Sequence, residues 1–257
     1  MGHVTGYDTA TKLAQDRNVR SMLKKQYPTS KRLPRGLELL YEDRDILVVD
    51  KPAGLLTVGT ETNKFKTASY ILTDYVRKGC LKSRNRIFIV HRLDQWTSGV
   101  LIFAKSEEVK LRLQAQWKGT EKQYVAVVYG HLAQKEGMIT SYLSENKAYV
   151  VYSTTDVTKG KLARTAYKVL KETKQFSLLE INLLTGRKNQ IRVHMADKGH
   201  PIVGDRKYGK AKDGYSRLAR HSKLIYFKHP TSGEQMTFES KVPNYFNKLV
   251  GNIQDRL

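Results

Sequence analysis

The side chains best suited to chemistry gather in a short polar segment that starts at His91 and reads His-Arg-Leu-Asp-Gln-Trp-Thr-Ser-Gly. It lies between an apolar approach and the apolar run Val100–Ala104, so it predicts a polar loop between two strands. Such loops hold binding and catalytic groups at the edge of a rigid sheet. An aspartate of ordinary pKa, about 3.9, is ionised at neutral pH, so Asp94 would offer this edge a permanent anion. On spacing alone the simpler interpretation is a turn in which Asp94 accepts hydrogen bonds from Thr97 and Ser98.

A second group of donors follows a predicted strand in the segment 184–195, Leu-Thr-Gly-Arg-Lys-Asn-Gln-Ile-Arg-Val-His-Met. If a helix begins near Gly186, its apolar residues face the core one turn apart, and Lys188 and Arg192 share another face. That face could hold a carboxylate or phosphates. A solvated basic helix is the alternative. The segment that follows, 199–209, is rich in turn residues and predicts a structured loop.

The elements that must position these groups are a sheet with few helices. Apolar residues at helical spacing from Ala68 to Val76 predict an amphipathic helix that ends near Gly79, and Ser106-Glu107-Glu108 starts a second helix that runs to Trp117. Little helical pattern separates most of the strands, which favours a mixed α+β fold with a largely antiparallel central sheet flanked by helices. The predicted strands are Ile46–Val49, Val100–Ala104, Gln123–Gly130, Leu162–Leu170, Phe176–Leu184, Leu224–Phe227 and Met236–Ser240.

Charge is the most informative feature of the composition, because 46 Lys and Arg against 24 Asp and Glu leave the 257-residue chain at +22. A chain this basic most often binds nucleic acid through phosphate contacts. No apolar run approaches the roughly 18 residues of a membrane span, and no signal-peptide pattern opens the sequence, so we expect a cytoplasmic protein. Cys80 is the only cysteine, and neither a Gly-rich phosphate loop nor metal-ligand spacing of histidines occurs. We therefore expect no nucleotide cofactor and no metal.

The basic residues also divide the chain. Residues 1–36 hold eight Lys or Arg against two Asp, a net charge of +6, together with Pro28 and Pro34 and a weak helical pattern around Leu13–Leu23. We expect a partly helical, loosely packed basic arm there, followed by one domain over 37–257. Since the domain is basic as well, the positive field belongs to the whole molecule.

Four segments carry a resemblance to a known family. YEDRDILVVDKPAGLL, HRLDQWTSGVLIFAKS, EKQYVAVVYG and LLTGRKNQIRVHMADKGHPIVGDRKYG resemble, in the same order, the motifs of RluA-type RNA pseudouridine synthases. The resemblance begins near Leu37 and extends to HPTSGEQMTFESKVP. It implies the pseudouridine synthase fold, with an RNA-binding cleft. Many members carry an N-terminal S4 module, and residues 1–36 are too short for a complete one.

The resemblance also implies roles for individual residues. Asp94 matches the essential catalytic aspartate, and Arg92 the residue that fills the space left by the flipped uridine. Tyr124 matches the tyrosine that packs on the base and takes part in proton removal, and Arg192 the basic partner of the catalytic carboxylate. Asn189 departs from the family, which usually has His there, and so does Arg220-His221-Ser222, which replaces a more common Leu-His-Ala. The residues expected to contact RNA are His91, Arg92, Arg187, Lys188 and Gln190.

We therefore predict a cofactor-independent isomerase that converts uridine to pseudouridine in ribosomal or transfer RNA, at a target in a loop or bulge where base flipping costs least. The carboxylate could attack C1′ or remove a proton from C2′, and the sequence leaves both routes open. The alternative is a non-catalytic RNA-binding or ribosome-assembly protein on the same scaffold. A DNA-binding protein is disfavoured, since no helix-turn-helix or zinc-finger pattern occurs.

Overall fold

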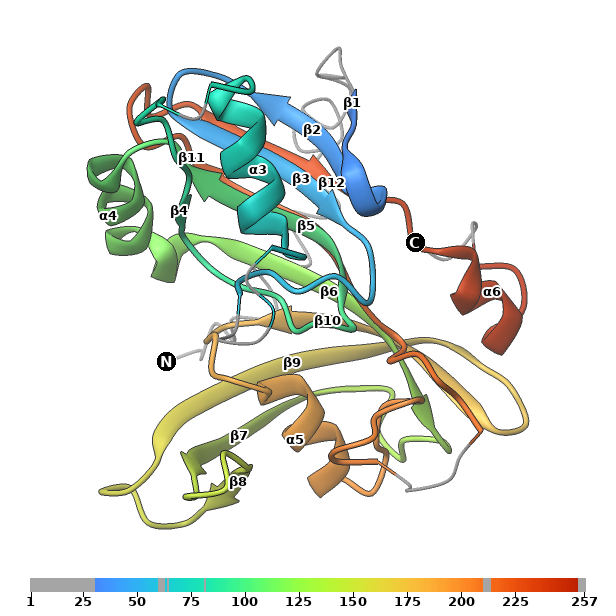
Figure 1. The fold of residues 1–257 in the computed structure, drawn as a ribbon. Coiled ribbons are helices and arrows are strands. Elements are labelled where there is room, and N and C mark those ends of the chain that lie inside the picture. Colours follow the sequence, from blue (N-terminus) through green and yellow to red (C-terminus); the bar gives the residue numbers. More distant parts are fainter. Residues whose placement is uncertain (1–30, 60–62, 64, 81, 210–213, 254–257) are drawn as a thin grey trace. The chain divides into compact units, whose positions relative to one another are not determined.

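The computed structural model of the chain describes residues 31–59, 63, 65–80, 82–209 and 214–253, and these form two compact units (Figure 1). The first unit comprises the described residues up to Glu121 together with Ser222–Lys241. The second comprises Lys122–His221 and the described residues from Val242 onward. Most of the predicted N-terminal arm, including its helical pattern, lies outside the described residues.

The first unit is built on strands in the order β1-β2-β3-β5-β11, with β12 beside β11 and β4 beside β5. The pairs β1/β2, β2/β3, β3/β5, β4/β5 and β11/β12 are all antiparallel, which confirms the predicted type of sheet. The strand bounds are β1 Lys31–Arg32, β2 Glu38–Glu42, β3 Ile46–Lys51, β4 Phe88–Ile89, β5 Ser98–Ala104, β11 Arg220–Lys228 and β12 Gln235–Glu239.

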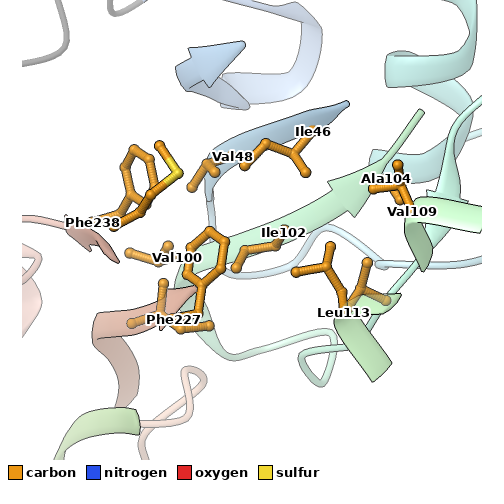
Figure 2. Packing of buried hydrophobic residues seen from close by; sticks show 12 residues of the cluster. Ile46, Val48, Val100, Ile102, Ala104, Val109, Leu113, Phe227 and Phe238 are labelled. Carbon is orange, nitrogen blue, oxygen red and sulfur yellow. The ribbon is translucent and has the colours of Figure 1, made fainter. Parts of the chain in front are cut away.

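Strand β5 is the centre of this unit. It lies between β3 and β11, and all seven of its residues are buried. Its side chains Val100 and Ile102 belong to a hydrophobic cluster with Phe227 and Phe238 (Figure 2). Full burial of one large apolar side chain stabilises the fold by about 1.5–3 kcal/mol. The polar segment that starts at His91 therefore leads into a fully buried strand at the centre of the unit.

Both predicted helices of the first unit are present. Helix α3, Ala68–Arg77, starts where the Thr67 hydroxyl accepts a hydrogen bond from the Tyr70 N–H (3.1 Å) and ends at Lys78, whose φ of 52° is left-handed. Helix α4, Glu107–Ala115, is capped in the same way by Ser106 and packs against β4 and β5. The hydroxyl caps supply partners for N–H groups that the first turn leaves unsatisfied.

The second unit has the strand order β6-β10-β9-β7-β8, with α5 packed on β8 and β9 and α6 on β10. Its strand pairs are antiparallel. Strands β6, β9 and β10 confirm predicted strands, whereas β7, β8 and α6 were not predicted. The bounds are β6 Glu121–Tyr129, β7 Glu136–Glu145, β8 Val151–Thr154, β9 Lys161–Glu172, β10 Phe176–Leu183, α5 Gln190–Asp197 and α6 Asn244–Val250.

Helix α5 begins later than predicted. The expected start near Gly186 is wrong, because Asn189 adopts a left-handed conformation with a φ of 54° and the helix opens only at Gln190. Lys188 therefore precedes the helix and does not share a helical face with Arg192. The apolar positions of the helix are buried as predicted. Among the described residues, no helix is long and apolar enough to cross a membrane.

Candidate active site

The loop that carries Asp94 is held by backbone hydrogen bonds on both sides of this residue. The Thr97 N–H donates to the main-chain carbonyl of Asp94 (3.0 Å), which closes a turn. On the other side, the Leu93 N–H donates to the Thr57 hydroxyl (3.2 Å), and that hydroxyl donates to the Leu93 carbonyl (2.8 Å). A main-chain hydrogen bond thus closes the turn at Asp94, and the buried Thr57 holds Leu93, the residue before Asp94.

Lys51 ties this loop to the end of β3. Its side chain is fully buried, and the ammonium donates hydrogen bonds to the carbonyls of Pro52 (2.9 Å), Leu55 (2.8 Å) and Gln95 (3.1 Å). A buried ammonium is tolerated only where acceptors replace its hydration. Three carbonyls from two loops meet that requirement. The loop after β3 and the Asp94 loop are therefore clamped at one point.

Glycines allow two close approaches around the same loop. The Gly54 N–H donates to the Gln95 carbonyl (2.8 Å), and the Gln95 amide donates back to the Gly54 carbonyl (3.1 Å). Gly99 has a φ of 113°, and a Cβ on it would lie 2.1 Å from the carbonyl oxygen of Ser222 in β11. Only glycine fits there. This close approach to Ser222 explains why the motif has a glycine at position 99.

A cavity of about 320 Å³ adjoins the Asp94 loop within the first unit. Gln95 lies on one wall, and Arg35 and Lys66 supply positive charge. The segment Pro52–Leu56, which follows β3, makes most of the remaining wall. A cavity of this kind beside the motif can hold part of a polyanionic ligand.

His91 has a structural contact in the first unit. Its Nε2 accepts a hydrogen bond from the Ile102 N–H of β5 (3.1 Å), and its ring lies 4.6 Å from the ring of Trp117. An N–H donor requires an unprotonated Nε2, which assigns the proton of the neutral ring to Nδ1. Arg92, the next residue, is exposed. The predicted RNA contacts of both residues stay predictions.

The second motif is organised by Gln190, the first residue of α5. Its side chain is buried, its amide nitrogen donates to the Arg164 carbonyl and to the Thr165 hydroxyl (both 2.9 Å), and its oxygen accepts from Thr185 (2.8 Å) and from the Arg187 N–H (2.9 Å). These bonds join the start of the helix to β9. The geometry gives Gln190 a structural task, and the RNA contact predicted for it stays a prediction.

Arg192 lies in a two-point ion pair that the sequence did not indicate. Its Nε and Nη2 donate to the two carboxylate oxygens of Asp205 (both 2.7 Å), and its Nη1 donates to Asn189 Oδ1 (3.1 Å). Burial alone would raise the pKa of Asp205, but the hydrogen bonds and charge of Arg192 outweigh it and lower that pKa. The guanidinium plane is thus fixed from the side.

Asn189, which stands where the family usually has His, takes part in the same network. While its oxygen faces Arg192, its amide nitrogen donates to the Tyr208 hydroxyl (3.1 Å). That hydroxyl accepts in turn from the Val151 N–H at the start of β8 (3.0 Å). The amide therefore connects α5 with the loop after it and with the β7–β8 hairpin.

The remaining predicted residues also belong to the second unit. Tyr124 lies in β6, is 7% exposed and is in register with Ile181 of β10. Arg187 donates to the Leu162 carbonyl (3.0 Å), and Lys188 pairs with Glu145. The structure thus groups His91, Arg92 and Asp94 in the first unit and the other five predicted residues in the second.

Three side chains that organise these loops were missed, namely Lys51, Thr57 and Asp205. The sequence shows Lys51 as part of a turn, and its acceptor Gln95 is 44 positions away. Asp205 lies in the segment that was predicted only to be a structured loop. A charged residue next to an apolar strand or within a turn-rich loop is a weak sequence signal, because its meaning depends on distant partners.

Comparisons with known proteins agree with these motifs. A family profile for RNA pseudouridylate synthase matches residues 45–197. The dual-specificity RNA pseudouridine synthase RluA of Escherichia coli is 37% identical over 216 residues, which cover 79% of this chain and 92% of that protein. The ribosomal large subunit pseudouridine synthase C of Rickettsia bellii is 36% identical over 219 residues, 82% of this chain and 70% of that protein.

A solved structure is similar in fold. Human RNA pseudouridylate synthase domain containing 4 matches with a TM-score of 0.67 and 22% identity, over 81% of this chain and 89% of that one. At this level of identity the match concerns the arrangement of strands and helices. It confirms the predicted α+β fold.

Proposed function

The chain belongs to the RluA-type family of RNA pseudouridine synthases, isomerases that convert uridine to pseudouridine in RNA, and we propose that Asp94 is its catalytic carboxylate. The observation that carries this assignment is the double anchoring of its loop. Thr57 holds the backbone before Asp94, and Lys51 holds the carbonyl after it. A carboxylate that must meet a ribose carbon benefits from such fixed backbone atoms.

The reaction needs a fixed anion and a proton acceptor. The bond from uracil N1 to C1′ breaks, the base turns while it stays bound, and a bond forms between C5 and C1′; C5 then loses its proton and N1 gains one. An anionic Asp94 can start this sequence by attacking C1′ or by removing a proton from C2′. We assign the later removal of the C5 proton to Tyr124 or to a water held by it.

Arg192 is the proposed partner of the catalytic carboxylate. An arginine has five N–H donors in a planar fork, and Asp205 and Asn189 accept bonds from three different nitrogen atoms of this one. An arginine oriented by a second carboxylate presents a preorganised positive charge. Such a charge stabilises an anion without reorganisation during the reaction. Asp205 is then a positioning residue, since it acts through Arg192.

The test of the assignment is Asp94→Asn, which keeps the size of the side chain and removes the anion. We expect tritium release from C5-labelled uridine in RNA to fall below detection, while the dissociation constant for RNA stays within about tenfold, or 1.4 kcal/mol. Asp74→Asn, which removes the charge of an exposed aspartate of α3, is the matched control and should keep full activity. An active Asp94→Asn protein would contradict the assignment. A wild-type protein that binds RNA tightly but releases no tritium would instead support the assembly-factor alternative.

The substrate we propose is ribosomal RNA, transfer RNA or both, at a uridine in a loop or bulge. The names of the relatives support both classes, since one is a dual-specificity enzyme and another acts on the large ribosomal subunit. An unpaired target lowers the cost of extruding the base, which is a few kcal/mol in a duplex. The place of action we propose is the cytoplasm. Chemical mapping of pseudouridine in total RNA from cells with and without the gene should show a site that disappears, and that site names the substrate.

A further inference from the structure

A second cavity of the first unit, of about 640 Å³, lies away from the Asp94 loop and has a strongly basic lining. Its floor and walls come from β2, the turn after it, the end of α3 and the segment before β4. The proposed function gives this cavity no role. Its charged lining residues are Lys31, Glu42, Arg44, Lys78, Arg86 and Lys105.

The single acid of the cavity is already engaged. Glu42 accepts hydrogen bonds from Lys105 Nζ (2.6 Å) and from the Tyr75 hydroxyl (2.7 Å). Although burial alone would raise the pKa of Glu42, these bonds lower it, so the carboxylate stays charged beside Lys105. The four other basic residues form no ion pair with an acid of the described residues. The cavity therefore keeps an excess of positive charge.

This positive charge is not needed to cap helix α3. The last carbonyls of a helix carry partial negative charge that basic side chains often neutralise. Here other groups do so: the Tyr75 carbonyl accepts from the Lys78 backbone N–H (3.1 Å), and the Val76 carbonyl accepts from the Asn85 amide (3.4 Å). The Arg77 carbonyl accepts from the N–H of the third residue after it (3.0 Å).

Two of the cations are also held in place by aromatic rings. Lys31 Nζ lies 4.8 Å from the centre of the Tyr75 ring, and the Arg86 guanidinium lies 4.9 Å from that of Phe88. Contacts of this length are attractive and restrict the side chains. Basic residues that serve only to keep a surface solvated require neither cations fixed by aromatic rings nor a cavity. A hollow with ordered cations is better suited to an anion that enters it.

The cavity and the Asp94 loop lie at opposite ends of one strand. The loop precedes Ser98, the first residue of β5, and Lys105 directly follows its last residue. Seven steps along a strand at about 3.3 Å each separate the two by roughly 23 Å. An RNA that places a uridine at the loop must continue for several nucleotides in one direction to reach that far. The distance suits a flanking stem or strand and excludes the flipped base itself.

We propose that this basic cavity, which we name by its residues Lys31, Arg44, Lys78 and Arg86, binds phosphates of the RNA backbone several nucleotides away from the target uridine. The inference rests on the proposed function for the identity of the polyanion. The cavity does not distinguish one RNA sequence from another, because contacts between its basic side chains and phosphates carry no sequence information. It adds affinity for long substrates and fixes their direction across the first unit.

The test compares two triple variants with the wild-type protein. Arg44→Gln, Lys78→Gln and Arg86→Gln together remove three cavity cations, and Lys168→Gln, Lys174→Gln and Lys198→Gln remove three exposed lysines of the second unit. Binding to unfractionated transfer RNA is measured from 50 to 300 mM salt. The cavity variant should lose about 2 from the slope of log affinity against log salt concentration, because each phosphate contact contributes roughly 0.7–0.9. The control variant should keep the wild-type slope.

Turnover provides a second and separate readout on the RNA identified by mapping. For the cavity variant, KM should rise about tenfold on the full RNA and change less than twofold on a minimal stem-loop around the target. Equal slopes for the two triple variants, or an equal KM defect on both RNAs, would overturn the proposal. Absence of turnover by the wild-type protein would refute the proposed function, and the salt slopes would still decide whether the cavity binds phosphates.

Discussion

Buried charged side chains define the candidate site at the scale of single residues. Lys51 is fully buried with three carbonyl acceptors, and the side chain of Asp205 is fully buried with two N–H donors from Arg192. Burial of such groups costs free energy unless every partner is supplied. Lys51 holds the carbonyl of Gln95, the residue after Asp94, and Asp205 holds the guanidinium of Arg192. The burial of Lys51 and Asp205 is thus explained by the groups that they orient.

The first prediction concerns the pair of Arg192 and Asp205. Asp205→Asn should lower the free energy of unfolding by about 3–5 kcal/mol, because it leaves a largely buried guanidinium without its anion. The value of kcat should fall with it, since Arg192 loses its orientation. Glu172→Gln, which removes one partner of the exposed pair with Lys135, is the control and should cost no more than about 1 kcal/mol. Urea denaturation gives the stabilities, and similar losses in the two variants would contradict the prediction.

A second prediction concerns pH. His194 of α5 is fully buried between the hydroxyls of Ser141 (3.0 Å) and Thr165 (2.9 Å), and burial lowers its pKa to about 4, against a weaker opposite effect of Asp197. Between pH 6.5 and 4 the unfolded chain binds a proton at this residue and the folded chain does not. The free energy of unfolding should therefore fall as the pH drops through this window, by about 1.4 kcal/mol per unit at most.

The variant His194→Gln removes this titration. Its stability deficit relative to the wild-type protein should shrink as the pH is lowered from 7 to 5, because only the wild-type chain pays for a neutral buried imidazole. Denaturant curves at three pH values measure this difference. A constant deficit would show that His194 titrates alike in both states. The lowered pKa of Asp205 acts below this window, since it matters only as that carboxylate protonates near or below pH 4.

At the scale of elements, Lys51 and Thr57 join two loops into one frame for Asp94. Lys51→Met shortens the side chain by one atom and removes a donor from three carbonyls, of which only that of Gln95 keeps a second donor among the described residues, the Gly54 N–H. We therefore expect a loss of about 2–5 kcal/mol in unfolding free energy. Thr57→Val should cost only about 1–2 kcal/mol. In both variants kcat should fall more than KM rises, because the loop is displaced and the RNA surface remains. Wild-type kcat in the folded Thr57→Val protein would contradict the proposed role of the frame.

The elements that the sequence predicts well are those whose pattern is purely local. Strands β3 and β5 are continuous apolar runs, and α3 has both a helical apolar face and hydroxyl capping. Strand β7 was missed because few of its ten residues are buried and they do not alternate regularly. Helix α6 was missed because it is short and has no side-chain cap. The start of α5 was placed too early because a left-handed Asn189 has no clear sequence pattern.

The site was predictable only in part for the same reason. The resemblance identified Asp94, Tyr124 and Arg192 by their motifs, which are local strings of residues. The roles of Lys51 and Asp205 depend on partners 44 and 13 positions away, and no local sequence pattern predicts such a contact. Gln190, assigned to RNA from its motif, has its amide engaged inside the second unit. A motif thus locates a functional segment better than it assigns a task to each member.

At the scale of the whole molecule, net charge links the two proposals. Residues 1–30 carry five Lys or Arg and two Asp, so +19 of the total of +22 belongs to the rest of the chain. Positive charge distributed in this way attracts RNA over a Debye length of about 8–10 Å at physiological salt. Specific contacts must then be distinguished from general attraction. The number of phosphates contacted, measured as a salt slope, makes that distinction.

The last prediction uses this slope to separate the N-terminal arm from the basic cavity. Deletion of residues 1–30 removes five basic residues and leaves Lys31 and the cavity in place, so the slope for transfer RNA should fall by about 1–3. If the arm and the cavity contact different phosphates, the deletion combined with Arg44→Gln, Lys78→Gln and Arg86→Gln should lower the slope by the sum of the two effects. A combined effect no larger than either one alone would mean that the two bind the same stretch of backbone. An unchanged slope after the deletion would remove the arm from the RNA interface, and the charge that binds RNA would then lie entirely in residues 31–257.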